Sequence, residues 1–185
     1  MADKSTVSQN LRNILEYIGD DPDREGLQET PERIIRSWEK LYGGYKRNPE
    51  DVLTTKFNEG ACNEMVILQD IEFYSTCEHH MLPFFGQVHI GYIPDEQVLG
   101  ISKLARLVEV YSRRLQIQER MTTQIADAIM EYAEAKGAIV ITKGQHFCMT
   151  SRGVEKQESK MVTNAIRGEF RKHKVKQEFL DTIQL

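Results

Sequence analysis

Apolar side chains recur at helical spacing over the first 60 residues. In residues 6–21, apolar residues follow one another every three or four positions until Gly19 ends the pattern. The residues of that stripe are Val7, Leu11, Ile14, Leu15 and Ile18. Residues 29–44 offer Thr30 as an N-cap, Pro31 at the first helical position and two glycines as the stop. The pattern predicts two amphipathic helices, and NPEDVL predicts one further short helical turn.

From Met65 the hydrophobic period changes. Two stretches are rich in β-branched and aromatic residues, with Pro83 and Gly86 between them, and this predicts two strands. Two amphipathic helices, two returning strands and a short closing helix are expected after them. The expected ranges are strands at 65–76 and 87–94, helices at 102–115 and 117–137, strands at 138–152 and 161–170, and a helix at 174–185. This order favours an α+β fold with an antiparallel sheet. We predict an N-terminal helical segment at 1–60 and an α+β domain at 61–185.

Composition narrows the classes of partner. The 185 residues, 40% of them hydrophobic, can bury one compact core. Lys and Arg total 24 against 28 Asp and Glu, and the formal charge of −4 gives no general attraction for nucleic acid. No apolar run approaches the roughly 20 residues of a membrane span, and the first ten residues lack the apolar core of a signal peptide. We expect a cytoplasmic protein with no nucleic-acid partner and no membrane partner.

The stretch STCEHHMLPFFG gathers metal-binding side chains. Cys77 and His80 are three positions apart, a spacing that lets one turn direct a thiolate and an imidazole at one ion. In HFC, His146 and Cys148 are two apart and so share a face of the predicted strand. Cysteine with histidine suits zinc, and three protein ligands with an open fourth position are typical of catalytic zinc. The alternative is that both cysteines are small buried apolar residues and the histidines are hydrogen bonded in the structure.

Five side chains compete for three ligand positions, because His79 also lies in this stretch. The surplus is chemically useful, since histidine titrates in the range where a catalytic water needs a proton donor and a proton acceptor. Two of the three histidines would then be acid and base. Cys62 is expected to be a free thiol and His89 a side chain on one strand face.

A second group of residues is basic. Ser102, Lys103 and Arg106 open a predicted helix, where free backbone N–H groups and cationic side chains suit a phosphate-sized anion. Arg152 follows the HFC stretch. Gln118 and Glu119 are an adjacent amide and carboxylate of the kind that can read a purine edge. For both groups the alternative is a solvated helix surface.

Three stretches together resemble the GTP cyclohydrolase I family. They are STCEHHMLPFFGQVHIGYIP, GISKLARLVEVYSRRLQIQERMTTQIADAI and HFCMTSRGV, and the resemblance runs from about Leu11 to Ile183. It implies an enzyme that hydrolyses the imidazole ring of GTP at C8, releases formate and rearranges the ribose to give 7,8-dihydroneopterin triphosphate. This is the first step of tetrahydrofolate and pterin biosynthesis.

The resemblance also implies roles for single residues. Cys77, His80 and Cys148 match the Zn²⁺ ligands, and His79 and His146 match the two catalytic histidines. Ser102 matches a residue near the ribose, and Gln118 and Glu119 match the guanine-recognition pair. The triphosphate clamp is matched by Lys103, Arg106 and Arg152, with Arg33 and Arg36 reaching in from another subunit.

The family fold implied is of the tunnelling type, with helices on one side of an antiparallel sheet and sheets that close into a barrel in a homodecamer. Active sites would lie between subunits. Two other classes stay open. One is a different pterin enzyme on the same fold, and the other is a metal or nucleotide binding module that has lost turnover.

Overall fold

The computed structural model describes residues 3–58, 62 and 64–184. By compactness these divide into two units, of which the first ends at Gly43 and the second begins at Gly44. The first unit holds α1 (Lys4–Tyr17) and α2 (Thr30–Leu41). Helix α2 starts at the residue expected to be its cap, with Glu29 in the N-cap position and Pro31 inside the first turn. The division at residue 60, drawn where the sequence pattern changes, stays a prediction.

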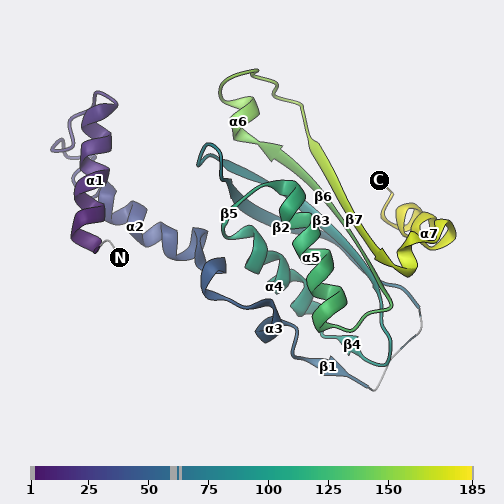
Figure 1. Cartoon of the computed structure of the whole chain (residues 1–185). Coiled ribbons are helices and arrows are strands. Elements are labelled where there is room, and N and C mark those ends of the chain that lie inside the picture. Colours follow the sequence, from purple (N-terminus) through teal and green to yellow (C-terminus); the bar gives the residue numbers. More distant parts are fainter. Residues whose placement is uncertain (1–2, 59–61, 63, 185) are drawn as a thin grey trace. The chain divides into compact units, whose positions relative to one another are not determined.

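The second unit is an α+β structure (Figure 1). Its helices and turns are η1 (Gly43–Lys46, which begins at the last residue of the first unit), α3 (Pro49–Val52), α4 (Ile101–Ser112), α5 (Gln118–Tyr132), α6 (Phe147–Thr150), η2 (Glu169–Arg171) and α7 (His173–Ile183). Its strands are β1 (Lys56–Phe57), β2 (Val66–Cys77), β3 (Pro83–Ile93), β4 (Val98–Leu99), β5 (Leu115–Gln116), β6 (Gly137–His146) and β7 (Met161–Gly168).

One five-stranded sheet carries this unit, in the order β5-β2-β3-β6-β7. The four long strands are antiparallel, as predicted, while β5 pairs in parallel with the end of β2 and makes the sheet mixed. Strand β3 begins at Pro83, four residues before the predicted start. Proline is tolerated as the first residue of a strand. Gly86 lies inside β3, not between the strands. The close approach of β6 explains the glycine, because a side chain there would meet the backbone of Lys143.

Helices cover both faces of the sheet, so the expectation of helices on one side only was wrong. Helices α4 and α5 bury the main core against one face. On the other face, α7 packs Phe179 and Ile183 against Ile139 and Ile141 of β6. The apolar run AIVI in β6 is buried on both sides, which is the pattern of a strand covered twice.

A β-bulge interrupts β2. Between Leu68 and Ile71 the chain advances three positions while β3 advances two, from Ile90 to Val88. Asp70 lies in this bulge with a φ of 58°, and its backbone N–H donates to Nδ1 of the buried His89 at 3.3 Å. His89 is therefore a side chain on a strand face, as predicted, and it also satisfies a backbone group that the bulge leaves out of the ladder.

Candidate metal centre and active site

The turn between β2 and β3 brings two of the predicted ligands together. The Cys77 N–H donates to the Leu82 carbonyl at 2.8 Å, and the Met81 N–H donates to the Cys77 carbonyl at 2.8 Å. Met81 has a φ of 53°, a left-handed conformation that lets the chain reverse in so few residues. The Cys77 Sγ then lies 3.6 Å from the His80 Nδ1.

The third predicted ligand comes from a different element than expected. Strand β6 ends at His146, and Cys148 lies on the helical turn α6, so the two residues do not share a strand face. The change to helix turns Cys148 toward the end of β2. As a result the ligand atoms of Cys77, His80 and Cys148 all lie within 4.8 Å of one another.

The donor set and its spacing fit a tetrahedral zinc ion. Bonds of about 2.3 Å to sulfur and about 2.1 Å to nitrogen place a thiolate and an imidazole nitrogen about 3.6 Å apart at the tetrahedral angle. The separation of Cys77 Sγ and His80 Nδ1 has this value. Burial raises the pKa of the Cys148 thiol, and the neighbouring Cys77 raises it further. A bound cation would offset that repulsion, since metals bind the thiolate form.

Two further histidines border this group. The His79 side chain is 65% exposed, and its ring meets that of His80 edge to face at 6.2 Å between centroids. The His146 ring stacks on Phe84 with centroids 4.5 Å apart. Burial lowers the pKa of His146, and the charge of Glu119 opposes that shift. Neither His79 nor His146 belongs to the ligand group, so both are available for proton transfer.

Gln118 and Glu119 open helix α5 and have opposite surroundings. Glu119 is exposed in the first turn of the helix. Gln118 is 0% exposed, and its amide is hydrogen bonded to protein at both ends. A purine could reach Glu119 directly, whereas Gln118 offers no surface to a ligand in this structure.

Sequence reasoning missed an ion pair that holds the metal-site turn. Arg120 on α5 pairs with Glu78, the residue between Cys77 and His79, and holds the pKa of that carboxyl below its usual range. The Arg120 Nε also donates to Gln116 Oε1 at 3.0 Å, and the Glu78 N–H donates to the Gln116 carbonyl at 3.0 Å. Nothing in the local sequence separates Arg120 from other helix-surface arginines.

The basic residues of α4 lie at the other end of the same unit. The Leu99 N–H, just before α4, donates a hydrogen bond to Tyr92 Oη at 2.9 Å, while His146 stacks on Phe84. Phe84 and Tyr92 are both on β3, and their positions place them about 26 Å apart along the strand. Ser102, Lys103 and Arg106 are therefore on the order of 20 Å from the metal-ligand group of their own chain.

The remaining basic candidates differ in position. Arg152 follows α6, and its charge acts on the Cys148 thiol. Arg33 and Arg36 lie on α2 in the other unit, where both are exposed and Arg33 pairs with Glu29 at 2.8 Å. Within the second unit, Arg152 is thus the predicted phosphate contact whose charge acts on the ligand group.

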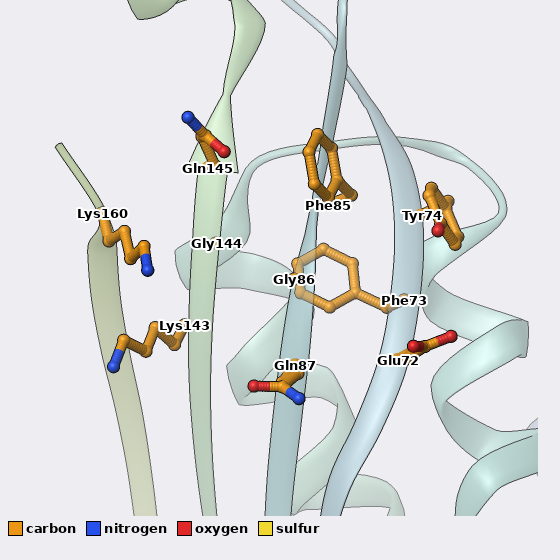
Figure 2. A pocket seen from close by; sticks show the side chains of 10 residues that line it. All are labelled: Glu72, Phe73, Tyr74, Phe85, Gly86, Gln87, Lys143, Gly144, Gln145 and Lys160. Carbon is orange, nitrogen blue, oxygen red and sulfur yellow. The ribbon is translucent and has the colours of Figure 1, made fainter. Parts of the chain in front are cut away.

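A hollow of about 350 Å³ lies on the face of the sheet opposite to the one that α4 and α5 cover. Figure 2 shows Lys143 and Lys160 on one side of it, Glu72 and Tyr74 on the other, and Phe85 between them. Because side chains alternate along β6, Lys143 faces this hollow while His146 faces the helices. The hollow contains none of the predicted metal ligands or catalytic histidines.

Comparisons with known proteins agree over nearly the full chain. The sequence model of the family described as GTP cyclohydrolase I matches residues 7–184. A protein of Wolinella succinogenes named GTP cyclohydrolase 1 is 58% identical over 98% of this chain and 97% of its own length. A protein with the same name from Thermobifida fusca is 52% identical over 98% of this chain and 88% of its own length. One from Campylobacter lari is also 52% identical, over 95% of this chain and 93% of its own length. The chain therefore belongs to the GTP cyclohydrolase I family and is an enzyme of that family.

Proposed function

We propose that this enzyme uses zinc to open the imidazole ring of GTP at C8, releases that carbon as formate, and forms 7,8-dihydroneopterin triphosphate. The observation that carries the proposal is the Cys77, His80 and Cys148 group with two histidines beside it that are not ligands. Family membership supplies the class of substrate. The reaction would be the first step of tetrahydrofolate and pterin biosynthesis, carried out in the cytoplasm.

In this proposal the protein's own residues bind GTP and move protons. A zinc ion held by Cys77, His80 and Cys148 supplies Lewis-acid activation of water near neutral pH. His146 and His79 take up and deliver protons at the purine nitrogens as the ring opens. Glu119 accepts hydrogen bonds from the guanine amide and amino groups. The resemblance pairs Gln118 with Glu119 in guanine recognition, but the Gln118 amide is buried and bonded to protein at both ends.

The triphosphate would be bound by cationic side chains from more than one chain. Arg152, whose charge acts on the Cys148 thiol, would contribute from the chain that holds the metal. Lys103 and Arg106, with Ser102 near the ribose, begin α4 at the far end of the unit. A GTP molecule cannot touch both ends of one unit across about 20 Å and keep its base at the metal. We therefore propose that these residues, together with Arg33 and Arg36, reach the site from neighbouring subunits.

The sheet edges support the same oligomeric arrangement. Among the residues that the structure describes, strand β7 has a partner on one side only, and β5 covers only the last two residues of the β2 edge. Unpaired edges of this length favour pairing with another chain. We propose that the edges join in a ring that closes a barrel, and that the assembly is a homodecamer.

The structure has no described helix with the length and apolar character needed to cross a membrane. A metal or nucleotide binding module without turnover remains the second candidate function. It would share every feature of the ligand group, and only the reaction separates the two.

The test follows formate and the ultraviolet spectrum of the pterin while purified protein is incubated with GTP, with and without a zinc chelator. We expect both products to disappear on chelation and to return with added zinc. The variant Cys148→Ser should lose metal and activity, while Cys62→Ser, a cysteine outside the ligand group, should keep both. Zinc-loaded protein that binds GTP and leaves it unchanged would favour the binding module.

A second variant separates ligand from proton-transfer residue in adjacent positions. His79→Ala should keep wild-type zinc content and lose most ring opening, since general acid or base catalysis contributes about 10²–10⁴-fold. Normal turnover with normal zinc content would contradict the role of His79.

A further inference from the structure

The amide of Gln118 has its orientation fixed by what surrounds it. Its Nε2 lies 3.0 Å from the Thr142 carbonyl, 3.0 Å from the Met161 carbonyl and 3.1 Å from Thr163 Oγ1. Carbonyl oxygens only accept hydrogen bonds, so the NH₂ end of the amide must face them. The reversed orientation would place an oxygen against two oxygens in a buried site, which is strongly unfavourable.

This orientation decides which nitrogen of His146 carries its proton. The Gln118 Oε1 lies 2.9 Å from His146 Nε2, and an amide oxygen can only accept. The His146 Nε2 must therefore be the donor. The other ring nitrogen, Nδ1, has no hydrogen-bond partner among the residues that the structure describes.

We propose that Gln118 is a positioning residue that holds His146 as the Nε2–H tautomer and so makes Nδ1 the nitrogen that accepts a proton in the reaction. The proposal rests on the proposed function for the role of His146. When a proton from water or substrate moves to the Nδ1 lone pair, the resulting imidazolium keeps its Nε2–H donated to Gln118. The ring gains a proton without changing either its hydrogen bond or its stacking on Phe84.

Gly144 gives independent support, because it makes room for this contact. It precedes His146 by two positions on β6 and so lies on the same strand face. A Cβ at Gly144 would lie 2.4 Å from Gln118 Oε1, while its next neighbours would be at 3.4 Å. A side chain at this position would thus displace the oxygen that holds His146 and little else.

This role differs from guanine recognition. A residue that reads the base must present a polar group to the ligand, and Gln118 is 0% exposed with both ends of its amide engaged by protein. The two roles also predict different kinetics. A residue that binds the base contributes to GTP affinity, whereas one that orients a proton acceptor contributes to turnover.

The first experiment measures the tautomer in zinc-loaded wild-type protein containing ¹⁵N-labelled histidine. Solid-state NMR at a pH where the imidazole is neutral reports which ring nitrogen is protonated, and His146→Asn assigns the signal. We expect protonated Nε2 and unprotonated Nδ1. The opposite tautomer overturns the proposal. This result is independent of activity, so a protein that forms no formate would refute the proposed function and leave the tautomer measurement valid.

The second experiment compares turnover with GTP affinity. Gln118→Leu should lower kcat by about 100-fold or more, since the loss of a correctly oriented general base costs at least that much. The Kd for GTP should stay within about twofold of wild type. Gly144→Ala, which keeps the glutamine but displaces its Oε1 from His146, should reproduce both results and shift the His146 tautomer signal.

The matched control is Thr163→Val. It removes one acceptor of the Gln118 NH₂ group and leaves both carbonyls, so kcat and tautomer should stay as in wild type. Zinc content and oligomer size are compared for every variant. Near-normal kcat in Gln118→Leu with a Kd for GTP raised tenfold or more would assign Gln118 to guanine recognition and overturn the proposal.

Discussion

A mixture of two inactive variants should recover activity. One variant, Cys148→Ser, damages the metal-ligand group, and the other, Lys103→Ala with Arg106→Ala, damages the start of α4. Within one chain these two regions are on the order of 20 Å apart, since the eight strand positions between Phe84 and Tyr92 span about 26 Å. If a working site takes its metal from one chain and its α4 residues from a neighbour, a mixed oligomer can contain sites with both halves intact.

The magnitude follows from random assembly. In an equal mixture, half of the metal groups are intact and half of the α4 starts are intact, and the two choices are independent when they come from different chains. About one quarter of the sites should then be complete, giving about 25% of wild-type activity. If both halves came from the same chain, every site would carry one defect and mixing would restore nothing.

The assay is formate release after coexpression of the two variants with different affinity tags, so that only mixed oligomers are purified. Each variant alone gives the baseline, and tagged wild-type chains coexpressed in the same way give the upper reference. Activity no higher than the mean of the two parents, in oligomers shown to contain both chains, would refute the assignment of the site to two subunits.

Two further predictions concern residues outside the ligand group. Arg120→Met should lower zinc affinity by about 10–100-fold in a competition assay with a chelator, because it releases Glu78 and the turn that carries Cys77. Unchanged affinity would show that this turn keeps its conformation without the ion pair. Burial lowers the pKa of His89, with Lys143 lowering it further and Asp70 opposing, so the folded protein disfavours the charged ring. As pH falls, the imidazole of the unfolded chain protonates first, near pH 6.5. The contribution of His89 to the free energy of unfolding is therefore present above that pH and is lost as pH falls toward the folded pKa. For one proton, the free energy of unfolding changes by no more than about 1.4 kcal/mol per pH unit. His89→Asn, which keeps an acceptor for the Asp70 N–H, should remove this slope in urea unfolding at fixed protein concentration, and an unchanged slope would assign it to another group.

Hydrophobic periodicity predicted the elements well where they are long. Helices α4 and α5 and the four antiparallel strands overlap their predicted ranges, because each buries one continuous face, although β3 begins four residues early and β6 ends six residues early. The pattern did not predict β5, whose two residues are too few to show a period. It also missed the burial of α7 against the sheet, since an amphipathic helix does not say which surface it will cover.

The ligand group was predicted from residue chemistry, and its geometry was not. Cys148 was expected on a strand with His146, but the strand ends at His146 and one helical turn redirects the cysteine. A four-residue helical turn leaves no periodic signal. The burial of Gln118 was invisible for another reason, because its partners Thr142, Met161 and Thr163 are distant in sequence and meet it only after the sheet forms.

The bulge in β2 makes the metal group depend on a residue count. Val66 and Leu68 before the bulge and Ile71, Phe73 and Cys77 after it all face the main core, although their numbers change from even to odd. Asp70 is the extra residue of the bulge, so deleting it would restore strict alternation with Ile71 still opposite Val88 and Cys77 still directed toward Cys148. Deleting Asp70 should therefore leave zinc binding intact. Deleting Tyr74, which lies after the bulge, would instead move Cys77 to the position of Thr76 on the other face and should abolish zinc binding with all three ligands still encoded, and the zinc content of the two deletion variants distinguishes these outcomes.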